Sequence, residues 1–516
     1  MNFRGDFVSK LNRRNFLKLA GLSSSLLLLP NLTSWALQNL KKDNDGHPNI
    51  ILLVFDAMSA RNLSLYGYPR PTTPNLERFA EHATVYHSHY SNGNFTPAGT
   101  SSLLTGTYPW THRAINIRGI IKHDLIGNDI FTTLGDSYTR LAFPQNFWAN
   151  LILTQFENQI EHLLPSSSFS ELDFMISDFF AKDKNMTARA LDDFTFKLGG
   201  QPVPLVLGSL ERWMYSLKSS QLAHDGYPKN IPYTFDYPIN FRLEKVFDGL
   251  SSIFTNLKSP FFTYLHLLPP HAPYTASDKF HNLFKDGLKF IKKLEHPLSG
   301  KISNAEILQS RRQYDEYIAS TDHEFGRFLD FLESSGLFEN SYVFITSDHG
   351  EMFERGEIQH STPLLYDPVI HIPLLVSAPG QKSRRDIYTP TSSVDILPTI
   401  AQLAGKPLPS IIEGAPLPGF KGNADNFERS IYVVEAKLNP ANQPLNDATI
   451  VLRKGSQKLI HYTGYDREDI FEFYELESDF EEMNDLYPKK PLDAKRMKDE
   501  LLEAFYAANQ PYIKQQ

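Results

Sequence analysis

Short apolar runs separated by longer stretches with helical periodicity make up most of the chain after about residue 48. Four of these runs have the length and continuity of buried strands, namely residues 49–55, 261–267, 341–347 and 372–377. Between residues 314 and 335 apolar side chains recur every three or four positions, which is typical of an amphipathic helix. Strands that alternate with helices indicate an α/β fold with a large, mostly parallel sheet flanked by helices.

The pattern changes after residue 405. A proline-rich stretch at 407–418 predicts a boundary, and residues 449–454, 458–462 and 471–474 then read as short strands before a final helix from Asp493. We therefore predict a catalytic domain over 46–405 and a smaller C-terminal α+β subdomain over 406–516. Residues 145–240 show no clear period, and we interpret them as an insertion that could cover a site.

The first residues have the pattern of an export signal. Arg13 and Arg14 precede the apolar run 19–29, and small residues end at Ala36. This resembles a twin-arginine signal, although Asn12 stands where such signals usually carry Ser or Thr. The resemblance predicts a signal peptide over residues 1–36 and a periplasmic or secreted protein, with an ordinary secretory signal or a short anchor as the alternatives.

The composition of the chain limits its expected partners and excludes cysteine chemistry. The net charge is -8 without a basic run, so a nucleic acid polymer is not expected as a partner. No apolar run reaches the roughly 20 residues of a membrane span, so no span is expected after signal cleavage. The chain has no cysteine, which excludes disulfides, thiolate ligands and a cofactor made by oxidising a cysteine. The oligomeric state stays open.

Acidic and imidazole side chains follow two of the predicted strands. Asp56 ends the first run, and Asp348 with His349 directly follows the run 341–347. The carboxyl ends of parallel strands meet at one edge of a sheet, so we expect these side chains to lie together. Oxygen and imidazole ligands favour Zn or Mn, with Mg or Ca possible if only oxygens coordinate. As an alternative, Asp56 alone could cap a helix.

Four segments in chain order carry a resemblance to a known family. They are residues 49–56 (NIILLVFD), 66–75 (YGYPRPTTPN), 96–106 (TPAGTSSLLTG) and 347–351 (SDHGE). Together they resemble the sulfatase branch of the alkaline phosphatase superfamily. The resemblance implies an alkaline phosphatase/sulfatase-like fold and, counting back from Gly106, a nucleophile at Thr96. As an alternative, Thr96 before Pro97 could simply cap a helix.

The nucleophile segment departs from the sulfatase pattern. Sulfatases carry a Cys or Ser that is converted to formylglycine, followed by an arginine that is Thr100 here. A threonine cannot become formylglycine by the known maturation. The resemblance therefore implies an exported metal-dependent hydrolase that cleaves a phosphate ester, with a diester favoured, or a sulfate ester. Its substrate would be a small-molecule or envelope-derived anionic ester.

Three other functions remain open. The second is a phosphotransferase acting on an envelope lipid or glycan, and the third is a true sulfuric ester hydrolase. A binding protein on a decayed fold is the fourth. Transferases of this kind usually have several membrane spans ahead of the catalytic domain, and none is predicted here, so hydrolysis is favoured.

The resemblance also assigns roles to individual residues. Asp56, Thr96, Asp348 and His349 are the implied metal ligands. One metal is favoured over two, because Ala57 follows Asp56 and the segment 267–271 has Leu where a second cluster would need Asp. His271 and His360 are assigned to the substrate anion or the leaving group, with a structural role as the alternative. His266 is interpreted as a core or supporting residue rather than a ligand.

Overall fold

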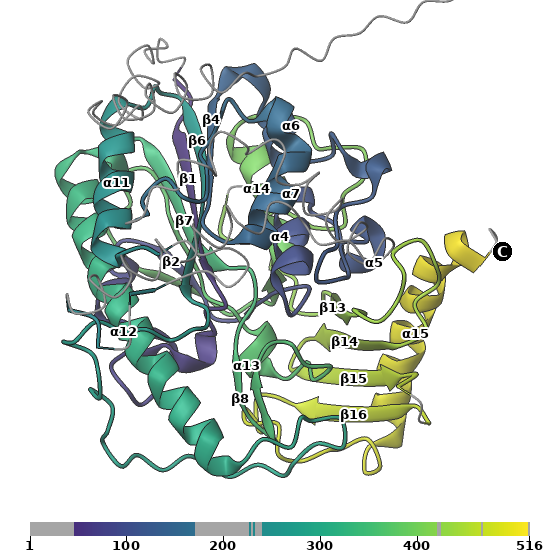
Figure 1. The fold of residues 1–516 in the computed structure, drawn as a ribbon. Helices are drawn as coiled ribbons and strands as arrows, with labels where there is room; N and C mark the ends of the chain where they lie inside the picture. Colours follow the sequence, from purple (N-terminus) through teal and green to yellow (C-terminus); the bar gives the residue numbers. More distant parts are fainter. Residues whose placement is uncertain are drawn as a thin grey trace, which may run out of the picture.

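A computed structural model describes residues 46–170, 226–228, 231–232, 240–420, 425–465 and 468–513. The predicted signal peptide and most of the predicted insertion lie outside these ranges. An eight-stranded sheet forms the centre of the larger part, and a four-stranded sheet with one long helix forms most of the smaller part (Figure 1). No helix among the described residues is long and apolar enough to cross a membrane.

The large sheet has the strand order β11-β2-β10-β7-β1-β6-β4-β5. Neighbouring strands are parallel except at β10, which is antiparallel to β2 and β7. The mostly parallel sheet predicted from the apolar runs is therefore confirmed. The strands are β1 (Asn49–Asp56), β2 (Thr84–Tyr86), β4 (Thr139–Pro144), β5 (His162–Leu163), β6 (Phe261–Pro270), β7 (Ser341–Ser347), β10 (Leu374–Ser377) and β11 (Arg385–Ile387).

Helices cover both faces of this sheet, so its central strands β1, β6 and β7 are almost entirely buried. Side chains of β1 alternate between the two faces: Ile51 and Leu53 join one core, Ile50 and Leu52 the other. The first core includes residues of α3 (Pro74–Ala80), α11 (Leu243–Asn256) and α12 (Asn304–Ser334). The second includes residues of α4 (Thr96–Thr105), α6 (Ile130–Leu134) and α14 (Ile396–Leu403), on the opposite side of the sheet in Figure 1.

The C-terminal subdomain is an antiparallel sheet of sequential hairpins, β13 (Ile431–Glu435), β14 (Ala448–Lys454), β15 (Gln457–Thr463) and β16 (Ile470–Glu475). The helix α15 (Pro491–Ile513) covers one face (Figure 1). The other face packs against residues of the catalytic domain, including Met352 and Val369. This second contact fixes the subdomain beside the loops that follow β7.

Short elements complete the described part of the chain: α5 (Pro109–His112), α7 (Phe147–Leu153), α13 (Asp367–Ile370), and two small sheets made by β3 (His89–Tyr90) with β12 (Thr391–Ser392) and by β8 (Met352–Glu354) with β9 (Glu357–Gln359). The strands predicted from sequence match observed ones within three residues at each end. The predicted helix 314–335 begins ten residues earlier, because Ser303 caps a polar first part of α12 that has no apolar period.

Candidate active site

The site begins where β1 and its parallel neighbour β7 end. Phe55 pairs with Ser347, so Asp56 and Asp348 emerge side by side at one edge of the sheet. The Ser347 hydroxyl donates to the Phe55 carbonyl at 2.6 Å, and the Ala57 amide donates to Asp348 Oδ1 at 3.2 Å. Both carboxylates are fully buried. The two predicted acidic residues are therefore brought together by strand register.

Thr96 reaches the same point as the first residue of α4. Phe95 is the N-cap residue, and no side-chain capping bond is present, so Thr96 is not the capping residue that the alternative interpretation required. Its Oγ1 lies 3.4 Å from Nε2 of His349. The helix packs closely on the loop after β7, since a Cβ on Gly99 would lie 2.0 Å from the Asp348 carbonyl oxygen.

Two carboxylate oxygens at the centre have no hydrogen-bond partner within the described part of the chain. They are Oδ1 of Asp56 and Oδ2 of Asp348, both buried. Nε2 of His349 lies 3.6 Å from each of these oxygens. Buried polar atoms are normally satisfied, and two unpaired anionic oxygens beside an imidazole fit a bound divalent cation. The donor set of oxygen and nitrogen suits the predicted Zn or Mn.

His266 belongs to this cluster, which the sequence interpretation did not foresee. Its Nε2 lies 3.2 Å from Oδ2 of Asp56 and 3.7 Å from Oδ2 of Asp348, and these three residues form one group that could hold a metal ion. The Tyr264 hydroxyl lies 2.8 Å from its Nδ1 and orients the ring. The sequence feature that could have indicated this role is a histidine in a predicted buried strand. That strand, β6, pairs in parallel with β1, so their carboxyl ends lie side by side.

Asn146 is a second residue that sequence reasoning missed. Its Nδ2 donates to Oδ2 of Asp56 and lies 3.4 Å from Oγ1 of Thr96. Its Oδ1 accepts from the Trp148 amide at 2.7 Å, which fixes the side chain at the start of α7. Asn146 follows β4, a strand that the apolar pattern did not reveal, and so it lay unnoticed at the edge of the predicted insertion.

The histidines predicted to face the substrate lie beside the cluster. The rings of His349 and His360 are 4.3 Å apart, and those of His271 and His360 are 5.0 Å apart, measured between centroids. Oε2 of Glu351 lies 2.7 Å from Nδ1 of His360, and Tyr274 donates to Oε1 of Glu351 at 2.6 Å. His349, Glu351 and His360 form a second group that could hold a metal, so the expected count of one metal stays a prediction.

The pKa values of the two central carboxylates are shifted in opposite directions. Burial raises the pKa of Asp56, but His271, His266 and His349 outweigh burial and hold this pKa below its ordinary value. Burial and the neighbouring Asp56 raise the pKa of Asp348. One carboxylate therefore favours its charge and the other resists it, which is the usual result when two acids share a buried site.

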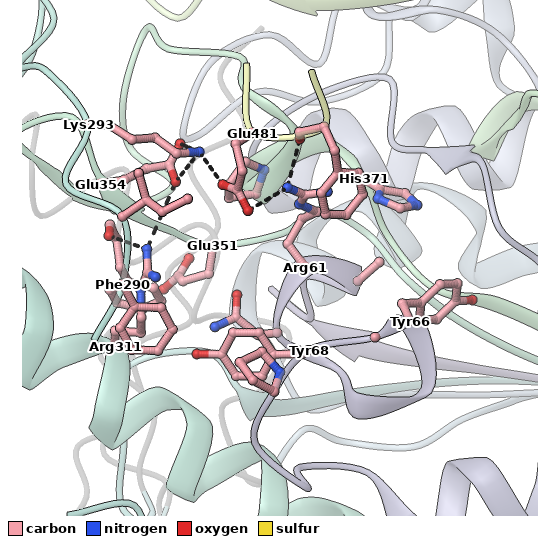
Figure 2. Close-up of a pocket in the computed structure, with 18 of the residues that line it drawn as sticks. Arg61, Tyr66, Tyr68, Phe290, Lys293, Arg311, Glu351, Glu354, His371 and Glu481 are labelled. Atoms are coloured by element: carbon pink, nitrogen blue, oxygen red, sulfur yellow. Dashed lines mark hydrogen bonds and ion pairs between the residues drawn. The ribbon is translucent and has the colours of Figure 1, made fainter. Parts of the chain in front are cut away.

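A cavity of about 410 Å³ adjoins the site, and Glu351 is part of its wall (Figure 2). The stacked rings of Tyr68 and Phe290, with centroids 6.0 Å apart, form another part. Lys293 pairs there with Glu354 at 2.9 Å and with Glu481 at 2.7 Å. The cavity therefore combines aromatic faces with mutually paired charges, and Thr96 is not among its lining residues.

The fold and this site define a class of protein: a mostly parallel α/β protein with a candidate metal-binding centre at the carboxyl ends of its strands. The model of the family "Sulfatase" matches residues 48–141 and 214–406, and the model "N-sulphoglucosamine sulphohydrolase, C-terminal" matches residues 359–507. The chain belongs to the sulfatase family. The resemblance stated from the four sequence segments is therefore confirmed.

Known relatives are similar over most of their length. Arylsulfatase K of Canis lupus familiaris is 24% identical, with 86% of this chain and 80% of the relative covered. Choline-sulfatase of Rhizobium meliloti (strain 1021) is 22% identical, with coverage of 87% and 84%. The solved phosphonate monoester hydrolase SpPMH from Silicibacter pomeroyi has a TM-score of 0.63 and 19% identity, covering 90% of this chain and 96% of its own.

Proposed function

We propose that this protein hydrolyses phosphorus esters, with a phosphate diester or phosphonate monoester favoured over a sulfate ester, and that Thr96 is the nucleophile. One observation carries the proposal: Thr96 Oγ1 lies at the start of α4, 3.4 Å from His349 Nε2, beside two buried carboxylates with unpartnered oxygens. The similarity to arylsulfatases and to a phosphonate monoester hydrolase supports ester hydrolysis and leaves the ester type to experiment.

The nucleophile argues against sulfate as the substrate. The chain has no cysteine, and Thr96 occupies the nucleophile position, so no residue there can mature to formylglycine. An unmodified hydroxyl attacks phosphorus when its proton is removed and its charge is stabilised. We infer that the departure at Thr96 moved the chain from sulfate toward phosphate chemistry within the family.

Asp56, Asp348 and His349, with Thr96, are the residues that would hold the metal, and His266 lies close enough to join them. A divalent cation bound there supplies Lewis acidity that favours ionisation of the Thr96 hydroxyl. Asn146 lies between Asp56 and Thr96, so its amide can donate to an ester oxygen that arrives at Thr96.

The reaction would follow two in-line steps. The Thr96 oxygen forms a bond to phosphorus while the bond to the leaving oxygen breaks, and that oxygen takes a proton. His271 would give it, because burial lowers the pKa of His271 but Asp56 and Glu351 raise it above its ordinary value; the ring of His360 lies beside it, 5.0 Å away between centroids. Water then attacks the Thr96 ester, and the released oxygen of Thr96 regains a proton.

A panel of chromogenic phosphate monoesters, phosphate diesters, phosphonate esters and sulfate esters tests this function on the metal-loaded protein. We expect the fastest turnover with a phosphorus ester. A sulfate ester hydrolysed more efficiently than every phosphorus ester would contradict the proposal and favour a sulfuric ester hydrolase. Transfer of the phosphoryl group to an added alcohol or glycan in preference to water would favour the envelope phosphotransferase.

A further inference from the structure

Lys437 brings a positive charge from the C-terminal subdomain to Phe95, the residue before Thr96. It follows β13 by two residues, and its Nζ lies 4.9 Å from the centre of the Phe95 ring. Phe95 directly precedes Thr96 and caps α4. Lys437 therefore contacts the residue that directly precedes Thr96, although more than 300 positions separate them in the chain.

The segment 92–96 ties this subdomain to the site. The Val434 amide donates to the Asn92 carbonyl at 2.9 Å, and Asn92 Nδ2 donates to the Tyr432 carbonyl at 2.8 Å. Two residues later, Asn94 Nδ2 donates to the His360 carbonyl at 2.8 Å. The strand that precedes Lys437, the nucleophile and His360 are thus joined through one short piece of backbone.

Hydrogen bonds also hold the loop that carries Lys437. Asn116 donates through Nδ2 to the carbonyls of Lys437 and Asn439, both at 2.9 Å. The Lys437 amide donates to Oε1 of Glu435 at 3.0 Å, and Tyr465 donates to Oε2 of Glu435 at 2.7 Å. Because these hydrogen bonds hold the loop in place, binding of a ligand by Lys437 would cost little further conformational entropy.

The ammonium group itself is buried and has no hydrogen-bond partner among the residues that the structure describes. It forms an ion pair with Oε1 of Glu435 at 3.7 Å, which is longer than a hydrogen bond. Burial lowers the pKa of Lys437, while Glu435 and Glu357 raise it. An ammonium has three protons to donate, and Lys437 uses none of them in a hydrogen bond within the described residues, so it can donate to an anion while its charge is paired with Glu435.

Lys437 approaches the site on the side of the segment that contacts His360. Its Nζ lies over the ring of Phe95, and the preceding residue, Asn94, donates to the His360 carbonyl. At the centre of the site, by contrast, the ion pairs of Asp56, Asp348 and Glu351 within the described ranges are all with histidines. The charge of Lys437 is therefore directed at the region where we place the leaving group.

We propose that Lys437 binds a second anionic group on the leaving-group part of the substrate. This inference rests on the proposed function and narrows it: the natural substrate is an ester whose departing alcohol carries a carboxylate, a phosphate or a sulfate of its own. Lys437 then determines specificity and takes no part in bond breaking. The C-terminal subdomain contributes to substrate choice through this side chain.

Two aryl methyl phosphate diesters test the proposal: one with a nitrophenol leaving group, and the same ester with a carboxylate on the ring. We expect the parent protein to favour the carboxylated ester in kcat/KM. Lys437→Met should lose about 10-fold to 100-fold on the carboxylated ester, the worth of one charged hydrogen bond, and stay within about twofold on the neutral ester. Lys437→Arg should keep most of the preference.

The exposed Lys382, paired with Glu339 at 2.9 Å, gives the matched control, and Lys382→Met should leave the preference unchanged. Activity of Lys437→Met on the neutral ester shows that the variant is folded. A parent protein without preference for the carboxylated ester would overturn the proposal, and so would an equal loss on both esters. Turnover of neither ester by the parent would instead count against the proposed function.

Discussion

Thr96 Oγ1 and His349 Nε2 lie 3.4 Å apart although 253 positions separate the residues in the chain. The contact requires the first turn of α4 to lie directly on the loop after β7. Ser91 strengthens this approach, because its hydroxyl donates to the Asp348 carbonyl. Gly99 permits it, because any side chain there would meet that same carbonyl.

Gly99→Ala should destabilise the protein and disturb the site. The new Cβ would lie 2.0 Å from the Asp348 carbonyl oxygen, so helix and loop must separate, at a cost of about 1–3 kcal/mol. Denaturant unfolding and kcat/KM measure the two effects. Ser101→Ala on the same helix is the control, since its buried hydroxyl has no hydrogen-bond partner among the described residues and its loss should cost little. Equal stability of both variants would contradict the close packing.

Thr96→Ala should remove the nucleophile while Asp56, Asp348 and His349 still bind metal. We expect a fall in kcat of several orders of magnitude, about 10³ or more, in protein confirmed to carry metal. Thr96→Ser should keep part of the activity, because it retains the hydroxyl. Mass spectrometry of the parent, quenched during turnover, should detect a phosphorylated Thr96. Turnover by the alanine variant within about tenfold of the parent would identify water as the nucleophile.

A chelator should abolish activity, and Zn or Mn should restore it better than Mg, because imidazole joins the carboxylates in the donor set. His266→Ala should weaken metal binding by about 10-fold to 100-fold, as expected for a residue that ligates or orients a ligand. Elemental analysis after dialysis measures both metal count and retention. The exposed His82→Ala is the control. Two tightly bound metals per chain would contradict the single-metal prediction.

Asp322 should make stability depend on pH. This buried side chain accepts from the Asn75 and Leu76 amides of α3 at 2.8 and 2.9 Å. Burial raises its pKa to about 7 despite these bonds. Because the folded pKa exceeds the unfolded one, the group stabilises the fold fully below about pH 4 and loses this contribution as pH rises through 7.

Asp322→Asn should remove that dependence. The free energy of unfolding, measured in denaturant from pH 4 to 7, should fall more steeply for the parent than for the variant, by at most about 4 kcal/mol over the range. Asp330→Asn on the exposed side of the same helix should follow the parent curve, since Asp330 makes only a surface pair with Arg78. Parallel curves for the parent and Asp322→Asn would contradict the raised pKa.

We further propose export through the twin-arginine route, with cleavage after Ala36. Replacing Arg13 and Arg14 by lysine should leave the precursor in the cytoplasm, since the pair is the feature that distinguishes this signal. Cell fractionation with an antibody to the mature protein measures the outcome. Normal export of the double variant would favour the ordinary secretory route.

The sequence by itself determined the central strands and the main chemical groups. Continuous apolar runs at 49–55 and 341–347 gave two central strands, because strands buried on both faces have no polar alternation. Asp56, Asp348 and His349 could be grouped in advance, since the carboxyl ends of parallel strands share an edge. The start of α12 was not predicted, because its polar first turns depend on a cap rather than on an apolar face.

Only the tertiary structure decided which other side chains complete the site. His266 lies on a buried strand, and nothing in its neighbours along the chain distinguishes a ligand from a core residue until Asp56 lies 3.2 Å from it. Asn146 and Lys437 depend on how β4 and the C-terminal subdomain meet the start of α4. The proposed roles of these residues depend on distances between segments that are far apart in the sequence. Residue type and spacing within one segment cannot predict such distances.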